Sequence, residues 1–218
     1  MGVVELAIVD PNTLTERHRV LAELLAGLGV EKFKPDQLTS DAFGKPYLEL
    51  DKRQIGYSFS NARHEDGSFG LMALVDGFAV GVDVELWPRR SNDKDFLKSI
   101  ASPEDEGVLC VLSAGGYDAG IALWVIKEAA LKCLGEVMVD PRHLAVSQYR
   151  DGLFIVGPSA LAGAAHLEVS VKLFELRAEK WPELVFLCGA AMHKQFSTAL
   201  KDFKVSRFHC VGWQLSSL

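Results

Sequence analysis

The order of its predicted elements places this chain of 218 residues in the α+β fold class. A strand-like run and one amphipathic helix come first, strands and then helices follow, and strands fill the last third. Strands and helices do not alternate regularly, as they would in a doubly wound α/β protein. The order of elements is also loosely repeated, because a strand, a helix and sheet strands occur before residue 78 and again after it.

The first 30 residues predict a strand followed by a helix. Residues 3–9 form a short β-type run. From Thr15 onward apolar side chains recur at helical spacing, and Gly27 and Gly29 end this pattern. The apolar positions of the helix are Val20, Leu21, Leu24, Leu25 and Leu28.

Strands dominate the next segment, up to residue 86. Residues 31–44 are polar and irregular, and three strand-like runs come after them. Asp76-Gly77, between the second and third runs, is a dipeptide that a tight hairpin turn prefers. The three runs are residues 55–61, 69–75 and 78–86.

Helical patterns occupy the middle of the chain. A short helix is expected at residues 93–100, and Ser102-Pro103 begins another, with serine as the cap and proline in the first turn. A glycine-containing loop at residues 113–120 precedes the strongest helix, residues 121–134, which a glycine ends. The strand-like runs of the last third are residues 143–149, 153–156, 167–176, 184–190 and 205–213.

The composition argues against several classes of protein. The formal charge of −6 disfavours a protein that binds duplex DNA, so an anionic ligand must be held by a local cluster of Lys and Arg. Four widely separated cysteines match neither a zinc site nor a disulfide scaffold and indicate reduced thiols. The chain starts without signal-peptide features and has no apolar run long enough to span a bilayer. We expect a soluble cytoplasmic protein that binds neither nucleic acid nor membranes.

Two carboxylates alternate with valines in the sequence GVDVE, residues 81–85. Side chains two apart on a strand project from the same face, so Asp83 and Glu85 are expected to point together. Neighbouring carboxylates repel each other unless a cation lies between them, and Mg²⁺ is a suitable cation. Taken by itself, the motif is better explained as a strand with one solvated polar face.

The helical segment WVIKEAALK, residues 124–132, adds a third carboxylate and a lysine. Trp124, Glu128 and Lys132 are four residues apart and share one face of the helix. In isolation this is an ordinary glutamate–lysine pair beside a core tryptophan. Combined with the two-carboxylate strand, it suits a site for a metal ion and a diphosphate.

Two other segments carry cationic side chains. Gly44-Lys45-Pro46 presents a lysine from a rigid loop, and the strand-like run at residues 57–64 ends in Arg63 and His64. A surface lysine in a turn, and a strand that runs into a charged loop, explain the two segments equally well.

Taken in order, the four segments resemble the 4′-phosphopantetheinyl transferases of the larger, surfactin-synthetase-activating type. That family shows GKP, then F-(N/S)-x-S-H, then G-(I/V)-D-(I/V)-E, then W-x-x-K-E-(A/S)-x-x-K. The first, third and fourth motifs are intact here, and the resemblance extends from about residue 15 to residue 192. In the second motif Ala62 stands at the serine position and Arg63 at the histidine position, with His64 one place late.

The resemblance implies a fold and an activity. The fold would be a pseudo-dimer of two similar α+β halves, residues 1–78 and 79–218, of which the second carries the metal site. The activity would be Mg²⁺-dependent transfer of the 4′-phosphopantetheine group from coenzyme A to a serine of an apo acyl or peptidyl carrier protein, with release of adenosine 3′,5′-bisphosphate. A monomer would suffice for this activity.

The resemblance also implies roles for the site residues. Asp83, Glu85 and Glu128 would hold Mg²⁺. Glu128, or a water, would take the proton of the carrier serine, and Lys132 would steady the diphosphate. The adenosine 3′-phosphate would be gripped by Lys45 together with Arg63 or His64.

Other residues are assigned more loosely by the resemblance. The N-terminal half lacks the basic segment with which other members help to hold coenzyme A, and Arg17, His18 and Arg19 are possible substitutes. Lys127 could face either the ligand or solvent. The carrier protein is expected to meet the segment before residue 120, on a partly basic, partly apolar patch of Leu109, Val111, Leu112 and nearby Lys or Arg.

Three alternatives stay open at this stage. A degenerate relative would bind coenzyme A or a carrier protein without catalysis, in keeping with the altered position of Arg63. An unrelated Mg²⁺-dependent nucleotidyl or phosphoryl transferase would need a phosphate loop, and neither GxxxxGK(S/T) nor GxGxxG occurs. In a plain α+β domain, the carboxylates would be surface residues.

Overall fold

The computed structural model confirms the α+β class. It describes residues 3–9, 13–40, 45–50, 53–64, 67–77, 79–87, 94–135, 139–150, 153–162, 168–178, 181–193, 204–209 and 213–217. The helices are α1 (Leu14–Gly27), η1 (Pro35–Gln37), α2 (Lys94–Ile100), η2 (Pro103–Asp105), α3 (Glu106–Ala114), α4 (Ala119–Leu134) and η3 (Pro141–His143). The strands are β1 (Val3–Val9), β2 (Leu38–Ser40), β3 (Pro46–Leu50), β4 (Arg53–His64), β5 (Gly67–Asp76), β6 (Val80–Trp87), β7 (Leu144–Arg150), β8 (Leu153–Pro158), β9 (Val169–Ala178), β10 (Trp181–His193), β11 (Lys204–His209) and β12 (Trp213–Ser217).

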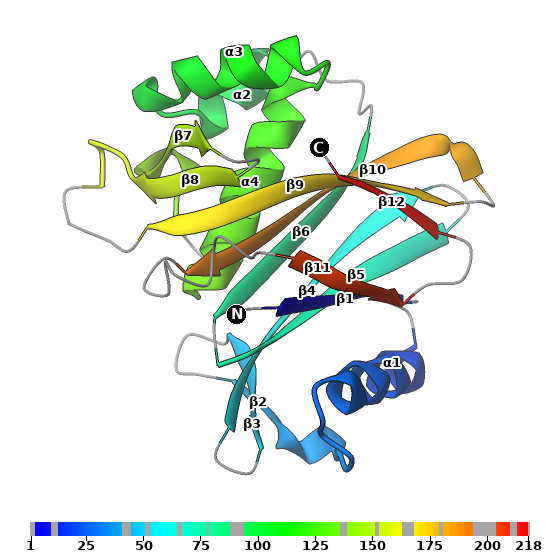
Figure 1. The fold of residues 1–218 in the computed structure, drawn as a ribbon. Helices are drawn as coiled ribbons and strands as arrows, with labels where there is room; N and C mark the ends of the chain where they lie inside the picture. Colours follow the sequence, from blue (N-terminus) through cyan, green and yellow to red (C-terminus); the bar gives the residue numbers. More distant parts are fainter. Residues whose placement is uncertain are drawn as a thin grey trace.

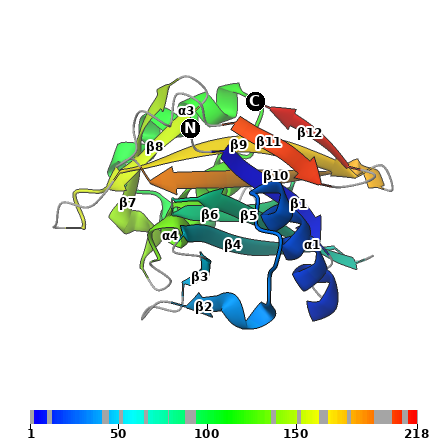
Figure 2. The same cartoon turned by 60° about the horizontal axis from the view of Figure 1, so that its bottom comes forward.

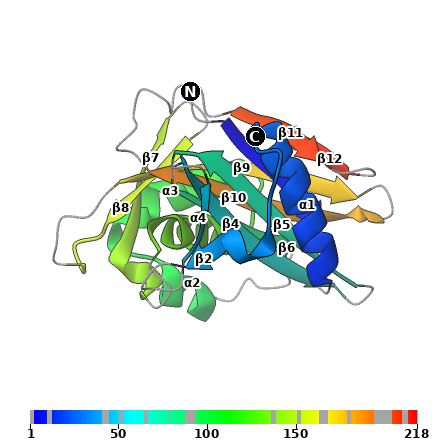
Figure 3. The same cartoon turned by 90° about the horizontal axis from the view of Figure 1, so that it is seen from below.

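The strands form two sheets, and one long helix lies on the outer face of each (Figure 1). The first sheet has the order β11-β1-β5-β4-β3-β2, and the second has the order β6-β10-β9-β8-β7, with β12 beside β9. Strands β1 and β11 pair in parallel, and the other described pairs are antiparallel. Figures 2 and 3 agree that α1 and α4 are separated by strands β4, β5 and β6.

Apolar side chains fill three layers between these elements. The layer between the two sheets includes Phe69 and Phe186, whose rings pack edge to face with centroids 4.1 Å apart. A second layer lies between α1 and the first sheet, and a third lies between α4 and the second sheet. The predicted apolar stripe of the first helix is confirmed, because Val20, Leu21, Leu24 and Leu25 are buried and Leu28 packs against them.

The two ends of α4 are fixed by side-chain and backbone geometry. At the N-terminus the Asp118 carboxylate accepts hydrogen bonds from the backbone N–H groups of Gly120 and Ile121, at 3.0 and 3.1 Å. At the C-terminus Gly135 has a φ of 80°, a left-handed conformation that glycine adopts without strain. The predicted end of the helix at Gly135 is therefore confirmed.

Two glycines let α4 approach the second sheet closely. A Cβ atom on Gly81 of β6 would lie 2.1 Å from the carbonyl oxygen of Ala129, and one on Gly189 of β10 would lie 2.9 Å from a methyl group of Val125. No larger side chain fits at Gly81 unless the helix moves. This contact sets the spacing between β6 and the face of α4 that carries Glu128.

Several predictions of local structure were wrong. Asp76-Gly77 does not form a hairpin between its flanking strands, because β5 and β6 belong to different sheets. The N–H of Gly77 instead donates to the carbonyl of Gln54 in β4, at 2.8 Å. The single strand predicted at residues 205–213 is two strands that join different sheets, and the segment expected to be irregular contains η1 and β2.

No single helix in the described part of the chain is long and apolar enough to cross a membrane. The bent pair Pro103–Ala114 and Ala119–Leu134 passes that test jointly, by length and composition alone.

Candidate active site

The edges of the two sheets meet at β4 and β6. Strand β6 is the end strand of the second sheet. In the first sheet β3 pairs only with residues 53–56 of β4. In the described structure, the rest of β4 therefore has no strand of its own sheet on the side where β3 lies. Instead, the backbone N–H of Val82 donates to the Ser58 hydroxyl at 3.0 Å. The site lies at this junction, where α4 packs on β6.

The predicted alternation of side chains along β6 is confirmed. Val82 and Val84 are buried in the layer between the sheets. Asp83 and Glu85 meet side chains of α4, because Asp83 accepts a hydrogen bond from Lys132 and Glu85 accepts one from the indole N–H of Trp124 at 3.2 Å. Two side chains that lie two residues apart on β6 therefore contact side chains of one face of α4, whose residues lie four apart.

Asp83 is buried at the centre of the site. Its Oδ1 atom accepts hydrogen bonds from the Lys132 ammonium at 2.6 Å and from the Ser60 hydroxyl at 2.9 Å. Lys132 also donates to the Ser60 hydroxyl, at 3.0 Å, so the three side chains form a closed triangle. The Oδ2 atom of Asp83 is buried and has no hydrogen-bond partner in the described structure. A buried carboxylate oxygen without a partner is costly unless a cation or donor is bound to it.

Glu128 lies in the field of the other two carboxylates. Burial raises the pKa of Glu128, the negative charge of Asp83 raises it further, Lys132 opposes this, and Glu85 adds to it. The three predicted metal ligands are therefore close enough to interact electrostatically. A cation bound among them would relieve their repulsion.

The donor chemistry fits Mg²⁺, although the carboxylates are not arranged as a finished cage. Among the described residues, no group of three or more His, Cys, Asp and Glu side chains lies close enough together to hold a metal ion. Mg²⁺ usually takes one or two carboxylates and completes its shell with water and substrate phosphates. The unpaired oxygen of Asp83, with Glu85 and Glu128 nearby, supplies such a partial set.

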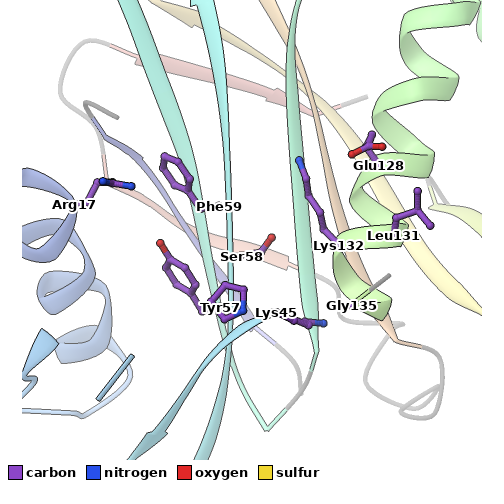
Figure 4. Close-up of a pocket in the computed structure, with 10 residues that line it drawn as sticks. Arg17, Lys45, Tyr57, Ser58, Phe59, Glu128, Leu131, Lys132 and Gly135 are labelled. Atoms are coloured by element: carbon purple, nitrogen blue, oxygen red, sulfur yellow. The ribbon is translucent and has the colours of Figure 1, made fainter. Parts of the chain in front are cut away.

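A pocket of about 400 Å³ opens beside these residues, between α1, β4 and α4. Figure 4 shows Arg17 on the α1 side, Glu128, Leu131 and Lys132 on the α4 side, and residues of β4 between them. Its lining comprises Arg17, Lys45, Pro46, Tyr57, Ser58, Phe59, Glu128, Leu131, Lys132 and Gly135. Three of these residues carry a positive charge, so the pocket suits an anionic ligand.

The other predicted phosphate-binding residues lie in different places. Lys45 lines the pocket, and its ammonium donates to the carbonyl of Cys133 in the last turn of α4. Arg63 is exposed near the end of β4 and is absent from the described pocket lining. His64 is the last residue of β4, and its side chain lies outside the described part of the structure. Their roles stay predictions.

Sequence reasoning missed the two serines of β4 that face the site. Ser60 bonds both Asp83 and Lys132, whereas Ala62 was assigned to the serine position of the F-(N/S)-x-S-H motif. Moved two residues toward the N-terminus, the motif reads Tyr57-Ser58-Phe59-Ser60-Asn61 and keeps both serines. The alternation of β4 was the signal that could have found this register, because Ser58 and Ser60 share a face.

Lys127 faces neither the pocket nor solvent. It is fully buried, and its ammonium donates to the Asp105 carboxylate at 2.6 Å and to backbone carbonyls, including those of Ile100 and Leu144 at 2.8 and 2.7 Å. Burial lowers the pKa of Lys127, and Asp105 opposes this shift. Asp105 also accepts from the N–H of Val146 at 2.7 Å, so this ion pair ties α4 to η2 and β7.

Lys127→Met is expected to lower the free energy of unfolding by about 3–5 kcal/mol, because it leaves the charge of Asp105 buried without its partner. Urea denaturation measures the loss. Lys98→Met is the matched control, since Lys98 pairs with Asp95 on the open surface and should change stability by about 1 kcal/mol or less. A loss no larger at Lys127 than at Lys98 would show that the buried pair does not hold these elements together.

The expected apolar docking patch is only partly present. Val111 of α3 is 44% exposed, whereas Leu112 is buried and Leu109 packs against the core around α4. The first turn of α3 carries Glu106 and its last turn carries no basic residue. The assignment of this surface to a carrier protein stays a prediction.

The comparisons with known proteins point to the same part of the chain. Residues 79–182 match the family model of the 4′-phosphopantetheinyl transferase superfamily. The match begins one residue before β6 and ends in β10, so it includes all of β6 and α4. A comparison with curated proteins finds no match. Residues 79–182, which supply the four charged side chains at the β6–α4 contact, are therefore similar to the 4′-phosphopantetheinyl transferase superfamily, over slightly less than half of the chain.

Proposed function

We propose that this protein transfers the 4′-phosphopantetheine group of coenzyme A to a serine of an apo acyl or peptidyl carrier protein. One observation carries the proposal beyond the superfamily match. A pocket lined by three cations and Glu128 lies beside a buried aspartate that has one carboxylate oxygen unpaired. Phosphate groups would meet the cations, and the carboxylates would meet a metal ion bound to those phosphates.

Lys132 is the residue best placed to bind the diphosphate of coenzyme A. Its side chain is held by Asp83 and Ser60, and it remains 31% exposed on the pocket side of α4. A preformed cation binds a phosphate without first losing rotamer freedom. Lys45 adds a second charge from the loop that precedes β3.

Asp83, Glu85 and Glu128 would hold Mg²⁺. When bound, the ion would neutralise part of the negative charge on the diphosphate as the leaving group departs. In the described structure the Oδ2 atom of Asp83 has no hydrogen-bond partner, so this oxygen is available as a metal ligand. Glu85 is held by the indole N–H of Trp124, which fixes the direction of its carboxylate.

Glu128 would act as the general base. In the transfer the carrier serine oxygen forms a bond to the phosphorus that bears pantetheine, while the bond from that phosphorus to adenosine 3′,5′-bisphosphate breaks. The serine proton passes to the Glu128 carboxylate. Glu128 lines the pocket together with Lys132, so its carboxylate lies on the side at which the diphosphate would bind.

The proposal extends to features that the superfamily match leaves open. They are the larger, surfactin-synthetase-activating subtype, a pseudo-dimer divided near residue 78, a cytoplasmic location and a monomeric state. The alternative of a degenerate relative that binds coenzyme A or a carrier protein without catalysis is an outcome of the following experiment.

Incubation of the protein with coenzyme A, Mg²⁺ and each of several apo carrier proteins tests the proposal, with mass spectrometry of the carrier as the readout. We expect the carrier to gain the mass of one phosphopantetheine group. Excess EDTA should abolish the gain and added Mg²⁺ should restore it. A carrier whose acceptor serine is replaced by alanine is the control.

If no carrier gains mass, the transferase proposal is wrong. Binding of coenzyme A without any mass gain would favour the degenerate relative. A gain that persists undiminished in EDTA would refute the role given to the three carboxylates.

A further inference from the structure

The hydroxyl of Ser60 joins the first sheet to the charged residues of β6 and α4, and the proposed transfer gives it no role. Ser60 lies on β4, and its hydroxyl donates to the Oδ1 atom of Asp83 at 2.9 Å. The same hydroxyl accepts a hydrogen bond from the Lys132 ammonium at 3.0 Å. The side chain of Ser60 is buried. One short side chain therefore contacts both a proposed metal ligand and the proposed phosphate-binding cation.

The direction of each hydrogen bond around Ser60 follows from the chemistry of its partners. An ammonium has no acceptor atom, so Lys132 donates to both Ser60 and Asp83. The ionised carboxylate of Asp83 only accepts, so the single proton of the Ser60 hydroxyl is used for Asp83. The three side chains therefore have one consistent arrangement of protons.

Both donors bind the same oxygen of Asp83. Lys132 and Ser60 reach Oδ1 at 2.6 and 2.9 Å, whereas Oδ2 is buried and has no hydrogen-bond partner in the described structure. With Lys132 as its sole donor, the carboxylate could turn until the ammonium lies between its two oxygens. With two donors on one oxygen, any rotation short of a half-turn breaks both hydrogen bonds. The second donor therefore keeps Oδ2 uncovered.

The strand that carries Ser60 is fixed relative to β6. Ser60 pairs with Leu71 of β5 in antiparallel register. Ser58, on the same face of β4, accepts the backbone N–H of Val82 at 3.0 Å, one residue before Asp83. A serine side chain is short and loses little rotamer freedom, whereas Lys132 is attached through a flexible four-carbon stem. Ser60 is thus the rigid member of the triangle, against which Lys132 is placed.

The contacts of Ser60 are with the protein and not with the pocket. Ser60 is absent from the described pocket lining, whereas Ser58 belongs to it. An effect of Ser60 on the transfer would therefore pass through Asp83 and Lys132.

We infer that Ser60 is a positioning residue, which keeps the Oδ2 atom of Asp83 open to the metal ion and holds Lys132 beside it. The inference rests on the proposed function. Without the hydroxyl, Oδ1 of Asp83 keeps only the donor on Lys132, and Lys132 keeps only Asp83 as a described side-chain partner. The ion pair survives, but the orientation of the carboxylate is no longer set.

Binding of Mn²⁺ in the presence of saturating coenzyme A tests the inference, with electron paramagnetic resonance of the free ion as the readout. Ser60→Ala should weaken Mn²⁺ binding by about 10- to 100-fold, the range for a residue that orients a metal ligand. Ser60→Thr keeps a hydroxyl and should lose less. If Ser60→Ala does not fold, Ser60→Cys gives the same comparison, because a thiol fills the space of the hydroxyl and hydrogen-bonds only weakly.

Ser159→Ala is the matched control. Ser159 is also buried, and its hydroxyl donates to the carbonyl of Arg142 at 2.7 Å and accepts the N–H of Leu161 at 3.2 Å. It lies outside the described pocket lining. Each alanine variant loses a buried hydroxyl with two hydrogen bonds, so both should unfold at a lower urea concentration than the wild type. Mn²⁺ binding should weaken in Ser60→Ala alone.

The inference is wrong if Ser60→Ala binds Mn²⁺ as tightly as the wild type, because Ser60 would then serve stability alone. Equal weakening by Ser159→Ala would also contradict it, since the effect would follow any loss of stability. If the wild type binds no Mn²⁺ with coenzyme A present, the proposed function itself is overturned.

Discussion

Asp83→Asn is expected to slow phosphopantetheine transfer by about 10²- to 10³-fold, the loss typical of removing one preorganised electrostatic contact. Asparagine has nearly the same shape, so the fold should survive. Its amide, however, carries no charge to hold Lys132, and one carboxylate oxygen that is unpaired in the present structure is replaced by an amide group. The initial rate of mass gain by the carrier measures the effect.

Asp95→Asn is the control for this variant. Asp95 also pairs with a lysine, but the Asp95 and Lys98 side chains are 89% and 76% exposed, against 6% and 31% for Asp83 and Lys132. An exposed pair contributes little to stability and lies outside the pocket lining, so its loss should leave the rate unchanged. If Asp83→Asn transfers phosphopantetheine at the wild-type rate, Asp83 has no role in the active site.

Gly81→Ala is expected to lower the free energy of unfolding by about 3 kcal/mol or more, which is large for the addition of one methyl group. The new Cβ atom would lie 2.1 Å from the carbonyl oxygen of Ala129 and 2.3 Å from the backbone nitrogen of Cys133. These are backbone atoms, so no side-chain rotation relieves the contact. To accommodate the methyl group α4 must move away from β6, and Glu128 and Lys132 move with it.

The control for this variant is Gly107→Ala, in α3. A Cβ atom there meets nothing within 4 Å, and alanine in a helix is favoured over glycine by about 0.5–1 kcal/mol. The denaturant concentration at which half of the protein is unfolded should therefore decrease for Gly81→Ala and increase for Gly107→Ala. If Gly81→Ala unfolds at the wild-type denaturant concentration, the close approach of α4 to β6 does not determine the geometry of the site.

The sequence was sufficient to predict which side chains share a face. The spacing of two in β6 aligned Asp83 with Glu85, and the spacing of four in α4 aligned Trp124 with Glu128 and Lys132. Both are local properties of a strand and a helix, so they follow from the pattern alone. The end of α4 at Gly135 was predictable for the same reason.

Features that depend on distant contacts could not be predicted in this way. The Asp76-Gly77 turn has a hairpin sequence, but its flanking strands pair in different sheets, because the packing of whole strands outweighs a local turn preference. The burial of Lys127 depends on Asp105, 22 residues away, and on backbone carbonyls outside α4. Helical spacing places Arg17, four residues before Leu21, beside the apolar stripe of α1 and Arg19 away from it, but the pocket beside Arg17 depends on the distant elements β4 and α4.

The most direct test of the whole account is a crystal structure of the protein with coenzyme A and Mn²⁺, in which anomalous scattering locates the metal. We predict one anomalous peak beside the Oδ2 atom of Asp83, with the diphosphate against Lys132. Coenzyme A bound outside the pocket between α1, β4 and α4, or Mn²⁺ bound away from Asp83, would contradict the assignment of these residues to a single active site.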